Sequence, residues 1–143
     1  MPAGRFLLDS NIPLYTFDDE SPSKQARAKA LMEKATQTGE GCISMQVVQE
    51  CLSWLSSKAK RKTTVAERRD YLENILEPLA KPLPPMPLYR DALSLQERWK
   101  FSFYDALIVA AALLLECDTL YSEDFQHGQR IEGLTIIDPF VEA

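Results

Sequence analysis

The sequence has few of the residues that build several common kinds of site. It contains one histidine, His127, and three scattered cysteines, Cys42, Cys51 and Cys117, with no CxxC pair. A zinc site is therefore not expected, and the thiols are predicted to be reduced, as in a reducing cytosol. The longest apolar run, 106–115, is about half the roughly 20 residues that a membrane-spanning helix needs.

Other signals are also absent. No GxGxxG or GxxxxGK[ST] motif indicates a dinucleotide or P-loop site, and no nucleophile elbow indicates a catalytic triad. Residues 1–8 do not resemble a secretory signal, so we expect a cytoplasmic protein with no membrane association. The net charge of −5 argues against a protein that coats nucleic acid with basic side chains. It does not exclude an enzyme that holds RNA through metal ions.

The chain length of 143 residues, with 45% hydrophobic and 26% charged residues, predicts one globular domain over 1–143. Short apolar segments alternate with longer helical ones, which predicts an α/β fold with a short, mostly parallel central sheet and helices on both faces. Four prolines between 81 and 87 are expected to interrupt any helix there. We predict strands over 5–8, 41–44, 119–122 and 135–137, and helices over 22–38, 45–57, 65–77, 88–99 and 103–115.

Four acidic residues follow strands or begin helices at one predicted edge of the sheet. Asp9 comes directly after the first strand, and Asp124 follows the third strand in the same way. Asp105 lies in the first turn of the last helix, and Glu50 in the second turn of the second helix. Sites in open parallel sheets form beyond the carboxyl ends of the strands, so these carboxylates are expected to lie near one another.

Each acid also has a structural interpretation. Asp9 can be a turn residue, and Asp105 can be the acidic partner of a capping box with Ser102. Glu50 lies at the border of an apolar helix face and suits either solvent or a cleft. Glu123 competes with its neighbour Asp124 as a site residue. Taken singly each acid is better explained as structural, whereas four acids recurring at strand ends and helix starts favour a site.

Clustered carboxylates need a counter-charge, because like charges raise one another's pKa. Oxygen ligands favour Mg²⁺, with Mn²⁺ as a possible substitute, and such an ion suits hydrolysis of a phosphodiester. A phosphatase that forms an aspartyl-phosphate is disfavoured because such enzymes repeat the aspartate two residues later, where this chain has Asn11.

The segments that carry these acids resemble the PIN-domain nucleases, and most of all the VapC-type toxins of bacterial toxin–antitoxin pairs. The resemblance covers essentially the whole chain, in order, although no single motif is specific. It lies in Phe6-Leu7-Leu8-Asp9-Ser10-Asn11, in the glutamate that ends Ser44-Met45-Gln46-Val47-Val48-Gln49-Glu50, in Phe103-Tyr104-Asp105-Ala106-Leu107-Ile108-Val109-Ala110-Ala111-Ala112, and in Leu120-Tyr121-Ser122-Glu123-Asp124-Phe125.

The resemblance implies a Mg²⁺-dependent endoribonuclease with a three-layer PIN-like fold. Asp9 and Asp105 would be the most direct metal ligands, with Glu50 assisting and Asp124 as the fourth acid. Asn11 and Ser122 would orient these acids or a bound water without contacting the metal themselves. The family also implies an RNA substrate, a homodimer and a cognate antitoxin. The alternative is a non-catalytic PIN scaffold that binds RNA or a protein.

Three other features have weaker interpretations. The basic stretch 58–62, with Arg68 and Arg69 beyond it, could guide an RNA backbone, although a solvated helix end is favoured slightly. Trp54 and Trp99 are interpreted as core or dimer contacts rather than stacking platforms. His127 is interpreted as a loop hydrogen-bonding residue rather than a metal ligand.

Overall fold

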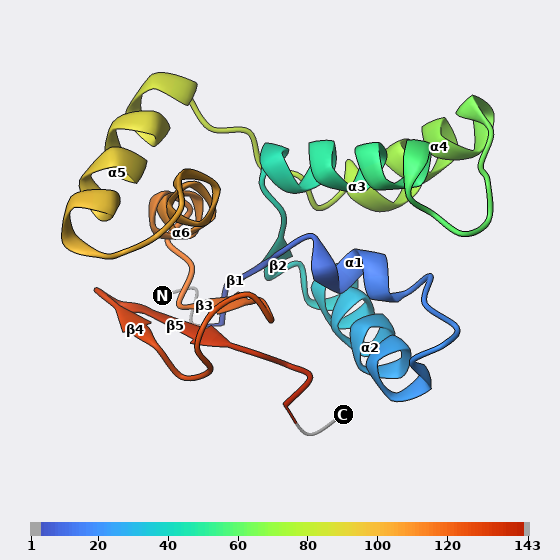
Figure 1. The fold of residues 1–143 in the computed structure, drawn as a ribbon, viewed down its shortest axis with the longest axis horizontal. Coiled ribbons are helices and arrows are strands. Elements are labelled where there is room, and N and C mark those ends of the chain that lie inside the picture. The colour runs from blue at the N-terminus through green and yellow to red at the C-terminus, as the bar shows by residue number, and fades with distance from the viewer. Residues whose placement is uncertain (1–3, 142–143) are drawn as a thin grey trace.

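The computed structural model describes residues 4–141 and builds them around one five-stranded sheet, in the order β2-β1-β3-β5-β4. Figure 1 shows this sheet with the helices grouped around it. Its neighbouring strands are parallel except for β4 and β5, which pair antiparallel as a hairpin. The predicted α/β class with a mostly parallel sheet is confirmed. The strands are β1 (Phe6–Leu8), β2 (Gly41–Cys42), β3 (Thr119–Tyr121), β4 (Arg130–Ile131) and β5 (Leu134–Ile137).

Helices cover both faces of the sheet. Strand β2 lies on one side of β1 in the sheet, and β3 lies on the other side. The connection from β1 to β2 therefore runs across the sheet in the opposite direction to the connection from β2 to β3. Because such crossovers are right-handed, the intervening helices α2 and α6 lie on opposite faces. All three residues of β1 are buried, as a strand covered on both sides requires. The helices are α1 (Asn11–Tyr15), α2 (Pro22–Thr38), α3 (Met45–Ser57), α4 (Val65–Tyr71) with the π-helical turn η1 (Leu72–Leu76), α5 (Pro85–Arg98) and α6 (Phe103–Leu114).

Local capping chemistry sets several of the helix ends where the sequence predicts them. The Ser44 side chain accepts a hydrogen bond from the Val47 N–H at the start of α3. Thr64 and Glu67 form a complete capping box at the start of α4. Gly39 ends α2 with a φ of 70°, a left-handed conformation that glycine adopts without strain.

Four details differ from the prediction. The short helix α1 occupies what reads as a turn after Asp9, and the two-residue strand β4 is too short to give a periodic pattern. The predicted helix over 65–77 changes to a π-helical turn after Tyr71. Helix α5 begins at Pro85 rather than Leu88, because proline is tolerated in the first turn of a helix, where its missing N–H has no helical partner.

The core is formed by the apolar strands and by the inner faces of α2, α3 and α6. Helix α6 carries a continuous buried segment from Ala106 to Ala112, in agreement with its apolar sequence. Within residues 4–141, no helix is both long and apolar enough to cross a membrane. Residues 1–3 and 142–143 of the predicted 1–143 domain lie outside the described residues.

Gly41 allows β2 and α2 to approach closely. A Cβ at this position would overlap the backbone and side chain of Ala35, and it would lie 2.8 Å from Cε2 of Phe6. Overpacking of this kind lowers stability by about 1–3 kcal/mol. We therefore expect Gly41→Ala to lower the free energy of unfolding by about 2–3 kcal/mol in urea titrations. The matched control is Gly133→Ala, whose Cβ would meet no atom within 4 Å. Equal stability of the two variants would contradict this packing argument.

Candidate metal centre

Asp9 is a buried carboxylate at the carboxyl end of β1. Its side chain is 6% exposed and accepts hydrogen bonds from Ser122 Oγ at 2.7 Å and from the Ser10 N–H at 2.7 Å. Burial raises the pKa of Asp9 to about 6, with smaller contributions from the nearby charges of Asp124 and Glu50. The two hydrogen bonds oppose this rise in pKa but do not cancel it. A group with these properties favours a nearby cation.

Ser122 links two of the predicted acids. Its hydroxyl donates to Asp9 Oδ2 and accepts from the Asp124 N–H at 3.1 Å. It therefore fixes the Asp9 carboxylate and the loop that carries Asp124. Asn11 acts on the same loop, because its Nδ2 donates to Asp124 Oδ2 at 3.3 Å. Each of these two residues therefore hydrogen-bonds to a predicted metal ligand, and their orienting roles stay a prediction.

Glu50 approaches from α3. Its Oε2 accepts a hydrogen bond of 3.4 Å from Gln46 Nε2, and the same amide nitrogen donates to the Tyr104 carbonyl oxygen in α6. Gln46 thus connects the helix that carries Glu50 with the first turn of α6. Gln46 is not among the residues predicted from the sequence, although its place one helical turn before Glu50 was a usable signal.

Asp105 lies half-buried in the first turn of α6, where its N–H donates to Ser102 Oγ at 3.1 Å. The backbone of Asp105 makes this cap. A complete capping box would also need the Asp105 carboxylate to accept a hydrogen bond from the Ser102 N–H. Within the described residues, this second bond is not formed. The carboxylate is therefore available to the site. Burial raises the pKa of Asp124, and the charges of Glu123, Asp105 and Glu50 raise it further. The four predicted acids are electrostatically connected.

The carboxylates are close enough for their charges to raise one another's pKa, as Asp9 and Asp124 show. In the part of the chain that the structure describes, no three acidic, histidine or cysteine side chains form a ready-made metal cage. Mg²⁺ does not need one, since it keeps several waters and binds through one or two carboxylates. Two oxygens here, Glu50 Oε1 and Asn11 Oδ1, are buried without a hydrogen-bond partner in the structure. Such acceptors need a donor or cation, so the residues present fit a hydrated divalent metal ion.

Glu123 belongs to a different network from its neighbour. Its carboxylate accepts a hydrogen bond of 2.7 Å from the Tyr15 hydroxyl and pairs with Lys24 Nζ at 3.3 Å. Asp124 instead faces Asn11. Glu123 and Asp124 are neighbours in one loop, yet their side chains have different partners. The sequence alone does not predict which of the two joins the site.

His127 takes the predicted loop role, and the three cysteines are buried. His127 Nδ1 accepts a hydrogen bond of 3.1 Å from the Asp138 N–H, which confirms a loop hydrogen-bonding role. Cys42, Cys51 and Cys117 are buried free thiols. The sulfur atoms of Cys42 and Cys117 lie 3.8 Å apart, a proximity that their spacing in the sequence does not indicate.

The order of these site residues along the chain can be compared with known families. The family model of the PIN domain matches residues 6–130, a range that includes most of the chain and the positions of all four acids. The chain belongs to the PIN-domain family. No curated protein matches this sequence.

Solved structures show the same PIN fold at low sequence identity. A toxin–antitoxin complex from Klebsiella pneumoniae matches with a TM-score of 0.66 and 20% identity, over 93% of this chain and 96% of that chain. VapBC2 from Rickettsia felis, bound to a DNA fragment from its promoter, matches with a TM-score of 0.62 and 20% identity, over 92% and 96%. VapC20 from Mycobacterium tuberculosis, a toxin that cleaves the sarcin–ricin loop, matches with a TM-score of 0.61 and 18% identity, over 83% and 89%.

Proposed function

We propose that this PIN-domain protein is a Mg²⁺-dependent endoribonuclease and the VapC-type toxin of a toxin–antitoxin pair. The observation that carries the proposal is the environment of Asp9. A carboxylate that is 6% exposed shares its surroundings with the charges of Asp124 and Glu50, and its pKa is raised to about 6. Like charges held together in this way are stabilised by a cation between them.

The proposed roles follow the resemblance to the PIN-domain nucleases. Asp9 and Asp105 would hold the metal ion most directly, with Glu50 assisting and Asp124 as the fourth acid. Ser122 would hold Asp9 in place through its 2.7 Å hydrogen bond. Asn11 would do the same for Asp124. When bound, Mg²⁺, or Mn²⁺ in its place, supplies an activated water and neutralises charge on the phosphodiester.

RNA is the favoured substrate and an antitoxin the favoured partner, because of the related structures. One is a toxin that cleaves the sarcin–ricin loop, and others are toxins in complex with antitoxins. An acidic site that must admit RNA is a suitable target for an inhibitor that covers it. The three free thiols are consistent with the reducing cytoplasm.

We also propose that the protein is a homodimer. Helix α5 exposes three large apolar side chains at helical spacing, Met86, Tyr89 and Leu93, which are 59%, 40% and 53% exposed. Residues at i, i+3 and i+7 lie on one face of a helix, so they form a stripe that a second copy of the chain would cover. Sedimentation of a Leu93→Glu variant beside the wild-type chain tests this interface.

The nuclease proposal is tested by incubating the purified chain with total cellular RNA in Mg²⁺ and in EDTA. We expect discrete cleavage products in Mg²⁺, none in EDTA, and none from Asp105→Asn, which loses a proposed metal ligand. The matched control is Asp91→Asn, an exposed aspartate on α5 that should leave cleavage unchanged. If neither Mg²⁺ nor Mn²⁺ supports cleavage and calorimetry detects no metal binding, a non-catalytic PIN scaffold is the remaining interpretation.

A further inference from the structure

Two hollows adjoin the proposed metal centre on the α3 side. The larger, of about 850 Å³, extends between α1, the start of α2 and the end of α3, and Asn11 and Glu123 line its inner side. The smaller, of about 470 Å³, contains Glu50 itself. Trp54 and Lys58 line both hollows. The smaller hollow therefore places a ligand next to one of the four proposed site acids, Glu50.

One row of side chains on α3 runs away from the metal centre. Glu50, Trp54 and Lys58 follow one another at intervals of four residues, so they lie along one face of the helix with steps of about 6 Å. An acid that faces the metal is thus followed by an indole ring and then by a cation. Trp54, predicted to be a core or dimer contact, is half-buried and lines both hollows.

The smaller hollow has the chemistry of a nucleotide site. Tyr104, next to Asp105 in α6, lines it together with Trp54, and the tyrosine is 65% exposed. Gln49, Ser53 and Ser10 line the same space and offer hydrogen-bonding groups for the edges of a base. Aromatic faces beside polar groups are the usual means of holding single-stranded nucleic acid, because every base has a face that can stack.

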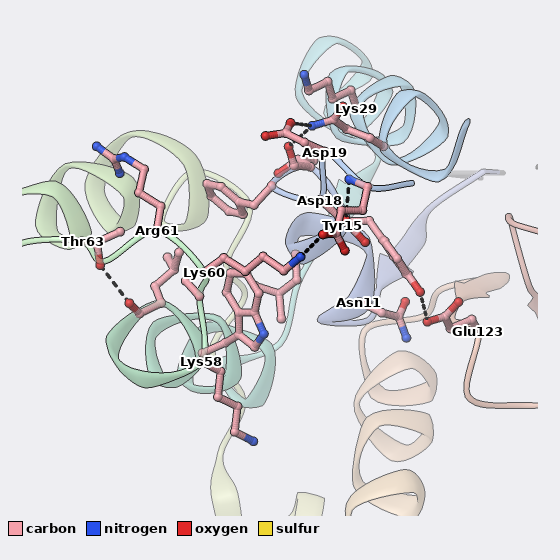
Figure 2. A pocket seen from close by; sticks show the side chains of 18 residues that line it. Asn11, Tyr15, Asp18, Asp19, Lys29, Lys58, Lys60, Arg61, Thr63 and Glu123 are labelled. Atoms are coloured by element: carbon pink, nitrogen blue, oxygen red, sulfur yellow. Dashed lines mark hydrogen bonds and ion pairs between the residues drawn. The ribbon is translucent and has the colours of Figure 1, made fainter. Parts of the chain in front are cut away.

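The charges favour the smaller hollow over the larger one for a polyanion. Figure 2 shows Asp18 and Asp19 on the wall of the larger hollow, facing Lys60 and Arg61 across it. Lys60 contacts Glu20 over this space, and Arg61 pairs with Glu67 at 2.7 Å. Four acids in all line the larger hollow, whereas Glu50 is the only acid among the described residues that line the smaller one. Lys58 lines both hollows and makes no ion pair within residues 4–141.

We propose that the smaller hollow binds a nucleotide of single-stranded RNA next to the bond that is cut, with a base stacked on Trp54 and a phosphate on Lys58. This subsite rests on the proposed nuclease function and adds to it two substrate-binding residues, Trp54 and Lys58. A duplex cannot bind in the same way, since its bases are already stacked on one another.

The two tryptophans of the chain allow a direct test. In a Trp99→Phe variant, Trp54 is the only indole, and its fluorescence reports stacking without any need for cleavage. We expect octamers of uridylate or adenylate, added in EDTA, to quench this emission by about half at saturation, whereas an RNA duplex of equal length leaves it unchanged. In the complementary Trp54→Phe variant, the emission of Trp99 should not respond to the octamers.

Binding of a fluorescein-labelled octamer, followed by anisotropy, measures the contribution of each side chain. Trp54→Leu is expected to raise the Kd about tenfold, and Trp54→Phe to retain most of the affinity because a phenyl ring still stacks. Lys58→Ala should reduce the slope of log K against log salt concentration by about one. The matched control is Lys62→Ala, a basic residue of the same stretch that lines neither hollow.

Cleavage of total RNA by the same Trp99→Phe protein separates the two proposals. Cleavage with an unquenched Trp54 and an unchanged Kd in Trp54→Leu would overturn the subsite and leave this face of α3 to a protein partner. Quenching without any cleavage would support the subsite as a binding site for RNA and overturn the nuclease proposal.

Discussion

Asp9→Asn is expected to reduce Mg²⁺-dependent RNA cleavage by more than about 100-fold. The carboxylate is the most buried of the four acids, and Ser10 and Ser122 hold it at the end of β1. Loss of a group that merely supports a metal ligand already costs about 10- to 100-fold in activity or affinity, so loss of a ligand itself should cost at least as much. Initial rates on a labelled RNA and calorimetry with Mg²⁺ measure the two consequences separately.

Glu123→Gln is the matched control for this loss. It removes one negative charge that raises the pKa of Asp124, but the Glu123 carboxylate itself bonds to Tyr15 and Lys24. We expect cleavage within a factor of a few of the wild-type rate. A loss in Glu123→Gln as large as that in Asp9→Asn would mean that overall charge, rather than a metal ligand, governs activity.

The stability of the metal-free protein is expected to fall as the pH rises from about 4 to 7. The pKa of Asp9 is about 6 in the folded chain against 3.8 for an ordinary aspartate, so between these values the folded state holds a proton that unfolding releases. The free energy of unfolding therefore decreases with pH, by about 3 kcal/mol in total for a difference of about two pKa units. Above about pH 7 both states are ionised and this dependence ends.

Urea titrations in EDTA at pH 4.5 and 7.5 measure this effect. Comparison with Asp9→Asn at each pH cancels the contribution of the other titrating groups, which both proteins share. The stability of the variant relative to wild type should rise by about 2 kcal/mol between the two pH values. Mg²⁺ at about 100 times its Kd should raise the free energy of unfolding of the wild type by about 2.7 kcal/mol and that of the variant by little. A difference between the two proteins that does not change with pH would show that Asp9 titrates normally.

The sequence by itself determined the elements whose causes are local. Ser44 and the Thr64–Glu67 box begin their helices, and Gly39 ends another, through bonds or backbone conformations that involve only neighbouring residues. The apolar residues of β1 and α6 likewise predicted buried elements, because continuous apolar segments must be covered. From these elements followed the class of fold and the edge of the sheet at which Asp9 and Asp124 would lie.

Only the tertiary structure determined the burial and the hydrogen-bond partners of each acid at this edge of the sheet. The raised pKa of Asp9 depends on burial by segments far away in the chain, and its bond to Ser122 joins positions 113 residues apart. The different directions of Glu123 and Asp124, and the place of Trp54 beside the site, likewise depend on distant partners. Capping, turns and periodicity act over a few residues, whereas burial and side-chain direction arise from contacts that exist only once the chain has folded.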